Sequence, residues 1–138
     1  MKEVNYSRYA PTTILHSGTY DGFDFKIVNY GDHPCSYVRL PENHKYYGVQ
    51  YSNIDIMVHG GITYSEIEDD GFWIGWDYGQ FTDYKGVLGE MNLMLGTPYN
   101  AKKWTTEEIW EHTKDVIHQL KGDTYESKQT QNQIKKTI

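Results

Sequence analysis

The sequence contains very little cysteine and no long apolar run, and each absence excludes a class of protein. Cys35 is the only cysteine, so an internal disulfide and a cysteine-based metal site are excluded. No apolar stretch reaches the ~18 residues that a membrane-spanning helix needs. Residues 1–10 lack the apolar core of a signal peptide. We therefore expect a soluble cytoplasmic protein that does not enter a membrane.

Basic residues are scarce as well, whereas tyrosine is abundant. Lys and Arg number 13 against 19 Asp and Glu, so the formal net charge is −6. We expect no non-specific nucleic-acid binding, because it requires clustered cations. Recognisable nucleotide, nucleophile and zinc-protease motifs are missing, and no cofactor is expected. The 13 tyrosines suit half-exposed sheets and binding surfaces, since tyrosine buries apolar area while its hydroxyl stays in water.

Alternation of apolar and polar residues predicts a small antiparallel β-sheet. Residues 20–40 contain two strand-like runs on either side of a turn, which indicates a first hairpin. Residues 54–64 and 72–78 alternate with apolar side chains on even positions, and an acidic turn separates them. These two runs predict a second hairpin with one apolar face. Residues 79–103 predict a loop with one helical turn.

A C-terminal helix is predicted over residues 104–121. Thr105 and Glu108 have the spacing of a capping box, and Gly122 is suited to ending the helix. An apolar stripe at helical spacing should cover the apolar face of the sheet. The expected fold is thus α+β, with two hairpins of about four or five strands and one long helix. Residues 1–122 should form a single domain, and residues 123–138 a polar tail or helical extension.

The expected register of the second hairpin predicts a candidate site. Pairing even residues about the acidic turn sets His59 opposite Asp77, Gly61 opposite Gly75, and Thr63 opposite Trp73. Glycine inside a strand often marks close approach by a ligand or another backbone. We therefore expect a shallow trough, which a ligand, a loop of the same chain or a second subunit would fill. The candidate ligand-binding residues are His59, Gly60, Gly61, Thr63, Trp73, Gly75, Asp77 and Asp83.

The expected pair of His59 and Asp77 has several interpretations. It would brace two strands, contact a ligand, or act as a general base oriented by a carboxylate. A metal would need about four ligands; His59, Asp77 and Asp83 are candidates, with His44 as a further one. No motif spacing supports a metal site. Bracing is favoured, so no catalytic residue and no metal site is assigned.

Several segments of the chain resemble, in order and spacing, an uncharacterised family found in phages, prophages and bacteria. The family motifs are V-H-G-G-[LI]-T-Y and G-[WF]-W-x-G-[FW]-D. The resemblance covers roughly residues 35–120. Where the family usually has Ala-His, this chain has Gly79-Gln80, while Asp83 is kept. A catalytic or metal role of that histidine in relatives would therefore be lost here. The matching segments are Tyr37–Gly48, Val58–Tyr64, Gly71–Asp77 and Trp104 to Leu120.

The resemblance implies a small phage-type accessory protein in the host cytoplasm. We expect it to act by binding and to inhibit a bacterial anti-phage defence, by sequestering a signalling nucleotide or by masking a defence protein. The nearest cations for a nucleotide would be Arg39, Lys45 and Lys85. The alternative is a small hydrolase that depends on a metal or on His59 and Asp77. A homo-oligomer assembled through the trough remains a third hypothesis.

Overall fold

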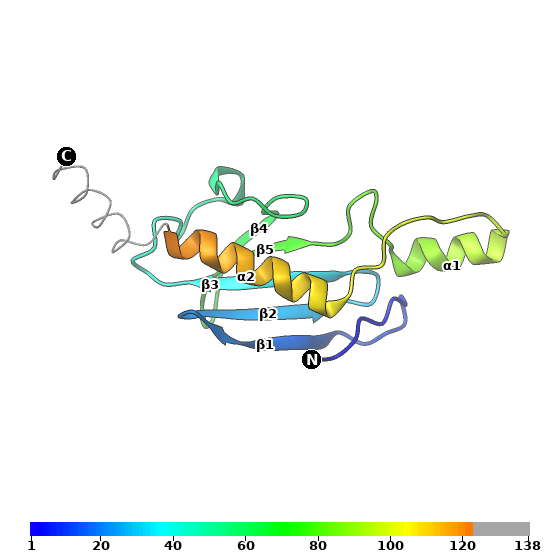
Figure 1. Ribbon diagram of the computed structural model, residues 1–138, viewed down its shortest axis with the longest axis horizontal. Helices are drawn as coiled ribbons and strands as arrows, with labels where there is room; N and C mark the ends of the chain where they lie inside the picture. The colour runs from blue at the N-terminus through cyan, green and yellow to red at the C-terminus, as the bar shows by residue number, and fades with distance from the viewer. Residues whose placement is uncertain (123–138) are drawn as a thin grey trace.

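The computed structural model describes residues 1–122, which form an α+β fold. One antiparallel sheet has five strands in the order β1-β2-β3-β5-β4, and α2 lies across one of its faces (Figure 1). The expected fold class is therefore confirmed, whereas the prediction for residues 123–138 lies outside the described residues. The elements are β1 Thr13–Tyr20, β2 Phe23–Asn29, β3 Pro34–Leu40, the 3₁₀ turn Tyr51–Asn53, β4 Tyr64–Glu68, β5 Gly71–Asp77, α1 Gly86–Leu95 and α2 Thr106–Gly122.

The core lies between the sheet and α2. Even residues of β5 face this core, and Phe72, Ile74 and Trp76 are all buried. Each large apolar side chain buried in this way stabilises the fold by roughly 1.5–3 kcal/mol. Because strand side chains alternate between faces, the odd residues of β5 point to the other side of the sheet. The helix contributes Ile109, Val116, Ile117 and Leu120, none of which is exposed to solvent.

One set of polar contacts determines where α2 begins, and another attaches α2 to the sheet. At its start, the Thr105 N–H donates to Glu108 Oε1 at 3.0 Å, and the Glu108 N–H donates to Thr105 Oγ1 at 3.2 Å. The predicted capping box is thus confirmed. Within the core, the Thr113 hydroxyl donates to the Ile109 carbonyl, so the Ser36 hydroxyl donates to Thr113 Oγ1 at 2.8 Å. This buried bond ties α2 to β3.

The register predicted for the second hairpin is wrong. Tyr64 pairs with Gly75 instead of Phe72, and Glu68 pairs with Gly71. Asp69 and Asp70 alone connect β4 to β5, so the turn is the tight type whose length determines register. The expected oppositions of His59 with Asp77, of Gly61 with Gly75 and of Thr63 with Trp73 are therefore wrong.

The two glycines of the His-Gly-Gly motif form a turn and interrupt the expected strand. Gly60 and Gly61 adopt φ angles of 72° and 75°, which side chains disfavour, and the Gly61 N–H donates to the Val58 carbonyl at 2.9 Å. The preceding segment pairs with no strand of the sheet, and it buries Ile54 and Ile56 in the core. Successive side chains of an extended chain point to opposite sides whether or not the chain pairs with a neighbouring strand. The sequence of this segment therefore has the alternation that is typical of a β-strand.

Residues 79–103 contain a helix of ten residues, α1, instead of the predicted single turn. Gly96 ends it with φ 67°, and the Thr97 N–H donates to the Asn92 carbonyl at 2.9 Å. The apolar side chains of α1 are distributed around the whole helix, so its sequence lacks the amphipathic period that marks a helix with one buried face. It extends away from the sheet (Figure 1). Among the described residues, neither α1 nor α2 is long and apolar enough to cross a membrane.

Candidate functional site

Asp83 is the centre of a buried hydrogen-bond network. Its side chain is 1% exposed and receives Trp104 Nε1–H at 2.8 Å, the Gln80 N–H at 2.9 Å and His59 Nε2 at 2.9 Å. A buried charge is tolerated only when such donors surround it. Asp83, and not Asp77, is therefore the carboxylate that orients His59.

Three separate segments bring this network together. The glycine turn holds His59, the loop after β5 holds Asp83, and the residues before α2 hold Trp104. The last two segments run side by side, because the Tyr84 N–H donates to the Lys102 carbonyl at 2.8 Å and the Lys102 N–H donates to Thr82 O at 3.1 Å. The site thus depends on tertiary contacts and not on one hairpin.

The ring of His59 has a fixed position and a fixed tautomer when neutral. Since Asp83 accepts at Nε2, the proton lies on that nitrogen, which leaves a lone pair at Nδ1. Among the described residues, none forms a hydrogen bond with Nδ1. The ring stacks on Tyr78 with centroids 5.3 Å apart and planes 10° apart, and it lies 4.9 Å from the Trp104 ring. His59 is therefore an oriented hydrogen-bond acceptor.

A second histidine, His112 on α2, has its tautomer determined in a different way. Trp76 Nε1–H donates to the Tyr78 hydroxyl at 2.9 Å, and an indole nitrogen can only donate. The Tyr78 side chain is fully buried and His112 Nδ1 is the one acceptor within reach of its hydroxyl among the described residues, so the hydroxyl donates its proton to that nitrogen at 2.8 Å. Burial lowers the pKa of His112, and the neighbouring His59 lowers it further. The neutral His112 ring therefore presents a donor at Nε2.

Both rings line one open groove, which we call the His59 groove. Its volume is about 550 Å³, within the range typical of small-molecule sites. His59, with a free acceptor at Nδ1, and His112, with a donor at Nε2, both line the groove, and so does the carboxylate residue Asp115. No lysine or arginine is among its described lining residues, which are Ile56, Met57, Val58, His59, Gly61, His112 and Asp115.

Asp77 belongs to a neighbouring network and forms no hydrogen bond with His59. It accepts Thr63 Oγ1–H at 3.0 Å, the Gly79 N–H at 2.9 Å and Gln80 Nε2–H at 3.1 Å. The structure therefore does not assemble the conditional catalytic pair of His59 and Asp77. The Gln80 side chain supplies one of these three N–H and O–H donors. It also occupies the space above Gly60.

Trp73 and Gly75 lie on the sheet face opposite α2, so they are separated from the His59 groove. A Cβ at position 75 would lie 2.5 Å from Cδ1 of Tyr37, which means that the Tyr37 ring covers the glycine. Trp73 Nε1–H donates to Asp70 Oδ1 at 2.7 Å, and the Lys26 ammonium lies 4.4 Å from the Trp73 ring centroid. The expected trough is thus filled by side chains of the same chain.

The conditional metal ligands are not brought together. Among residues 1–122, no group of three or more His, Cys, Asp or Glu side chains is arranged to hold a metal ion. His44 lies elsewhere, where its Nε2 donates to the Leu120 carbonyl at 2.8 Å. The expected cations Arg39, Lys45 and Lys85 are not among the described residues that line the groove. Arg39 binds Asp24, and Lys85 Nζ donates to the Gln80 carbonyl at 2.8 Å.

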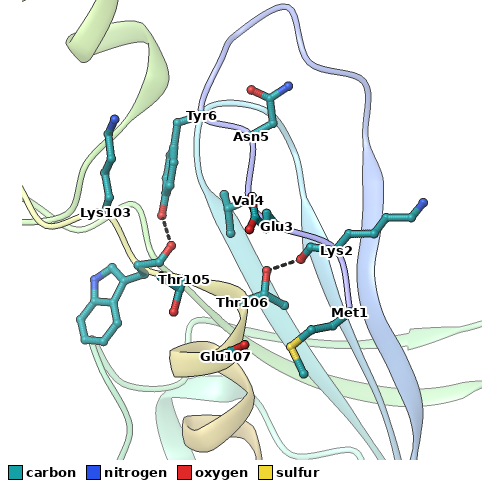
Figure 2. A pocket seen from close by; sticks show the side chains of 11 residues that line it. Met1, Lys2, Glu3, Val4, Asn5, Tyr6, Lys103, Thr105, Thr106 and Glu107 are labelled. Carbon is teal, nitrogen blue, oxygen red and sulfur yellow. Dashed lines mark hydrogen bonds between the residues drawn. The ribbon is translucent and has the colours of Figure 1, made fainter.

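A second cavity, of about 690 Å³, separates the N-terminal arm from the start of α2 (Figure 2). Across it, the Tyr6 hydroxyl donates to the Trp104 carbonyl at 2.7 Å, and the Thr106 hydroxyl donates to the Lys2 carbonyl at 2.5 Å. Burial raises the pKa of Tyr6 well above its ordinary value, so this phenol stays a donor. The arm therefore holds the backbone of Trp104, whose indole binds Asp83.

Sequence reasoning missed Tyr78, Trp104 and His112 as members of the site. One signal was available, since His112 follows Ile109 by three positions and so belongs to the buried side of the helix. Comparisons of the chain with protein-family models, curated proteins and solved structures found no match. The functional argument therefore depends on the geometry of the site.

Proposed function

We propose that this protein binds a small molecule in the His59 groove and acts by sequestering it, without catalysis. The supporting observation is that two histidines with opposite hydrogen-bonding character line one groove. His59 offers an acceptor and His112 a donor, and buried partners hold both rings. A molecule that carries both a hydrogen-bond donor and an acceptor complements this pair, whose ring centroids lie 6.5 Å apart. Nucleobase edges and amides have this pattern.

The charges around the groove favour recognition of a base over recognition of a phosphate. Asp115 lines the groove, and no lysine or arginine does so among the described residues. A phosphate placed there would lack a cation and would be repelled by the carboxylate. We therefore infer that a nucleotide ligand binds through its base and leaves its phosphates outside. Combined with the resemblance, this supports a phage-type inhibitor that sequesters a nucleotide signal of a bacterial defence.

Thermal-shift titrations test this proposal. The four common nucleosides and their cyclic nucleotides would be added to the wild type, to His59→Ala and to His118→Ala. His118 is the matched control, because it is an exposed histidine of α2 that lies outside the groove. At least one compound should raise the melting temperature of the wild type and the control but not of His59→Ala. If no compound raises the melting temperature of the wild type, the proposal is contradicted.

Hydrolysis is a second candidate function, and the pair of His59 and Asp83 favours it. A buried aspartate that holds a groove-lining histidine, and leaves a lone pair on its other nitrogen, is an arrangement suited to general-base catalysis. His59 Nδ1 would take a proton from water, and His112 Nε2–H would stabilise the negative charge that develops. Chromatography of cyclic nucleotides after incubation tests this. Turnover that His59→Ala abolishes would support it, whereas binding without product would support sequestration.

A further inference from the structure

The C-terminal half of α1 carries exposed apolar side chains in every direction. Leu93 is 82% exposed, Met94 83% and Leu95 73%. Met91 and Leu88 extend this area along the helix at 48% and 38% exposure. We call these residues the α1 apolar surface. Such a concentration of apolar residues on a projecting helix typically marks a contact with another molecule.

The described part of the chain anchors only the first half of α1. The Gly86 N–H donates to the Asp32 carbonyl at 2.8 Å, and the Val87 N–H donates to Asp32 Oδ1 at 2.9 Å. Arg8 binds Glu90 at 3.0 Å. A helix of about ten residues is marginal in water without packing on an apolar face. The second half of α1 therefore requires packing against another apolar surface to be stable.

The charges on α1 indicate which molecule covers it. Glu90 is the only charged residue of the helix, and Arg8 and the Ser7 hydroxyl of the same chain bind its carboxylate. No net charge remains on the α1 apolar surface, although the whole chain carries −6. In a symmetric contact the same patch meets itself, so a charged patch would repel its copy. Permanent contacts between identical chains are also more apolar than transient contacts with other proteins.

We propose that the α1 apolar surface packs against the same surface of a second copy of this chain and forms a symmetric dimer. This inference is independent of the proposed ligand. The contact would also support the site, because α1 begins shortly after Asp83. The Tyr99 hydroxyl donates to the Asp83 carbonyl at 3.2 Å and accepts the Lys85 N–H at 3.0 Å, so the two ends of the α1 segment meet beside Asp83.

Sedimentation or light-scattering mass measurement over a range of micromolar concentrations tests the dimer. The wild type should have twice the 16.2 kDa mass of the chain. The double substitution Leu93→Glu/Met94→Glu should give monomers, because it places like charges in the contact. Ile67→Glu is the matched control, since Ile67 is 63% exposed on β4 and should leave the dimer intact.

Circular dichroism would establish that each variant is folded. If the double substitution prevents folding, Leu95→Glu at the exposed end of the helix replaces it and should also give monomers. A wild type that stays at 16.2 kDa throughout overturns the proposal. So does a folded α1 variant that remains dimeric, or a wild-type assembly larger than a dimer.

Discussion

His59 Nε2 lies 2.9 Å from both carboxylate oxygens of Asp83, although 24 positions separate the two residues in the chain. Asp83 has almost no solvent contact, and its other donors come from Gln80 and Trp104. The buried carboxylate thereby fixes the orientation of the histidine ring, and the residue itself lines an open groove. This relationship makes the motif around His59 a candidate site and not only a turn.

Removal of the Asp83 carboxylate should destabilise the fold strongly. Asp83→Ala leaves the partly buried Trp104 indole N–H and Gln80 N–H without an acceptor. Because each unsatisfied buried donor costs about 1–3 kcal/mol, we expect a loss of about 3 kcal/mol in the free energy of unfolding. Urea titration measures this loss. Asp55→Ala is the control, since Asp55 is exposed and its replacement should change stability by less than about 0.5 kcal/mol. Equal effects of the two substitutions would argue against the network.

Substitutions of the two motif glycines should differ in their cost. Both glycines have positive φ, so alanine at either position should cost about 1–2 kcal/mol. A Cβ at position 60 would also lie 2.9 Å from the Gln80 side chain, whereas no atom lies within 4 Å at position 61. Gly60→Ala should therefore be the more destabilising change in thermal melts. Adding Gln80→Ala should reduce that extra cost, and an equal cost for both glycines would contradict the turn geometry.

The contact between Tyr37 and Gly75 should make Gly75 intolerant of a side chain. Gly75→Ala would place its Cβ 2.5 Å from the Tyr37 ring, so we expect a loss of about 2 kcal/mol or more by urea titration. In a double-mutant cycle, Tyr37→Ala should relieve part of this loss. Strictly additive effects would show that the tyrosine does not cover the glycine.

Acid should weaken the fold through His112. Burial lowers the pKa of His112 below its ordinary value of 6.5, so the unfolded chain binds a proton more readily than the folded chain. The contribution of neutral His112 to the free energy of unfolding is therefore complete above pH 6.5 and is lost as the pH falls below that value. Urea midpoints at intervals from pH 7.5 to about 5 should decrease less for His112→Gln than for the wild type. Identical slopes would contradict a neutral, buried His112. His16 also has a lowered pKa from burial, so some dependence should persist in the variant.

Local sequence signals predicted those parts of the fold whose sequence pattern arises within a single helix or strand. Thr105 and Glu108 identified the start of α2, because a capping box needs only residues of one turn. Alternation around Phe25 and Ile74 identified the core face of the sheet, since both side chains are buried as expected. These features depend on neighbours along the chain.

The site was harder to predict, because it depends on contacts between distant segments. Alternation in the segment before His59 has the same appearance in a paired strand and in the unpaired extended chain found here. The error of three positions in register then assigned Asp77, instead of Asp83, to His59. Period-two patterns indicate which face is buried but not which residue lies opposite. The full length of α1 was missed because this helix lacks an amphipathic period.

The most direct test of the account is nitrogen-15 NMR of the histidine rings during titration with adenosine, cytidine, guanosine and uridine. The account predicts that neutral His59 and neutral His112 both carry their proton on Nε2, and that at least one nucleoside shifts the ring signals of both. His118, outside the groove, should not shift. A proton on Nδ1 of either neutral ring, or unchanged signals of both rings with all four nucleosides, would contradict the account.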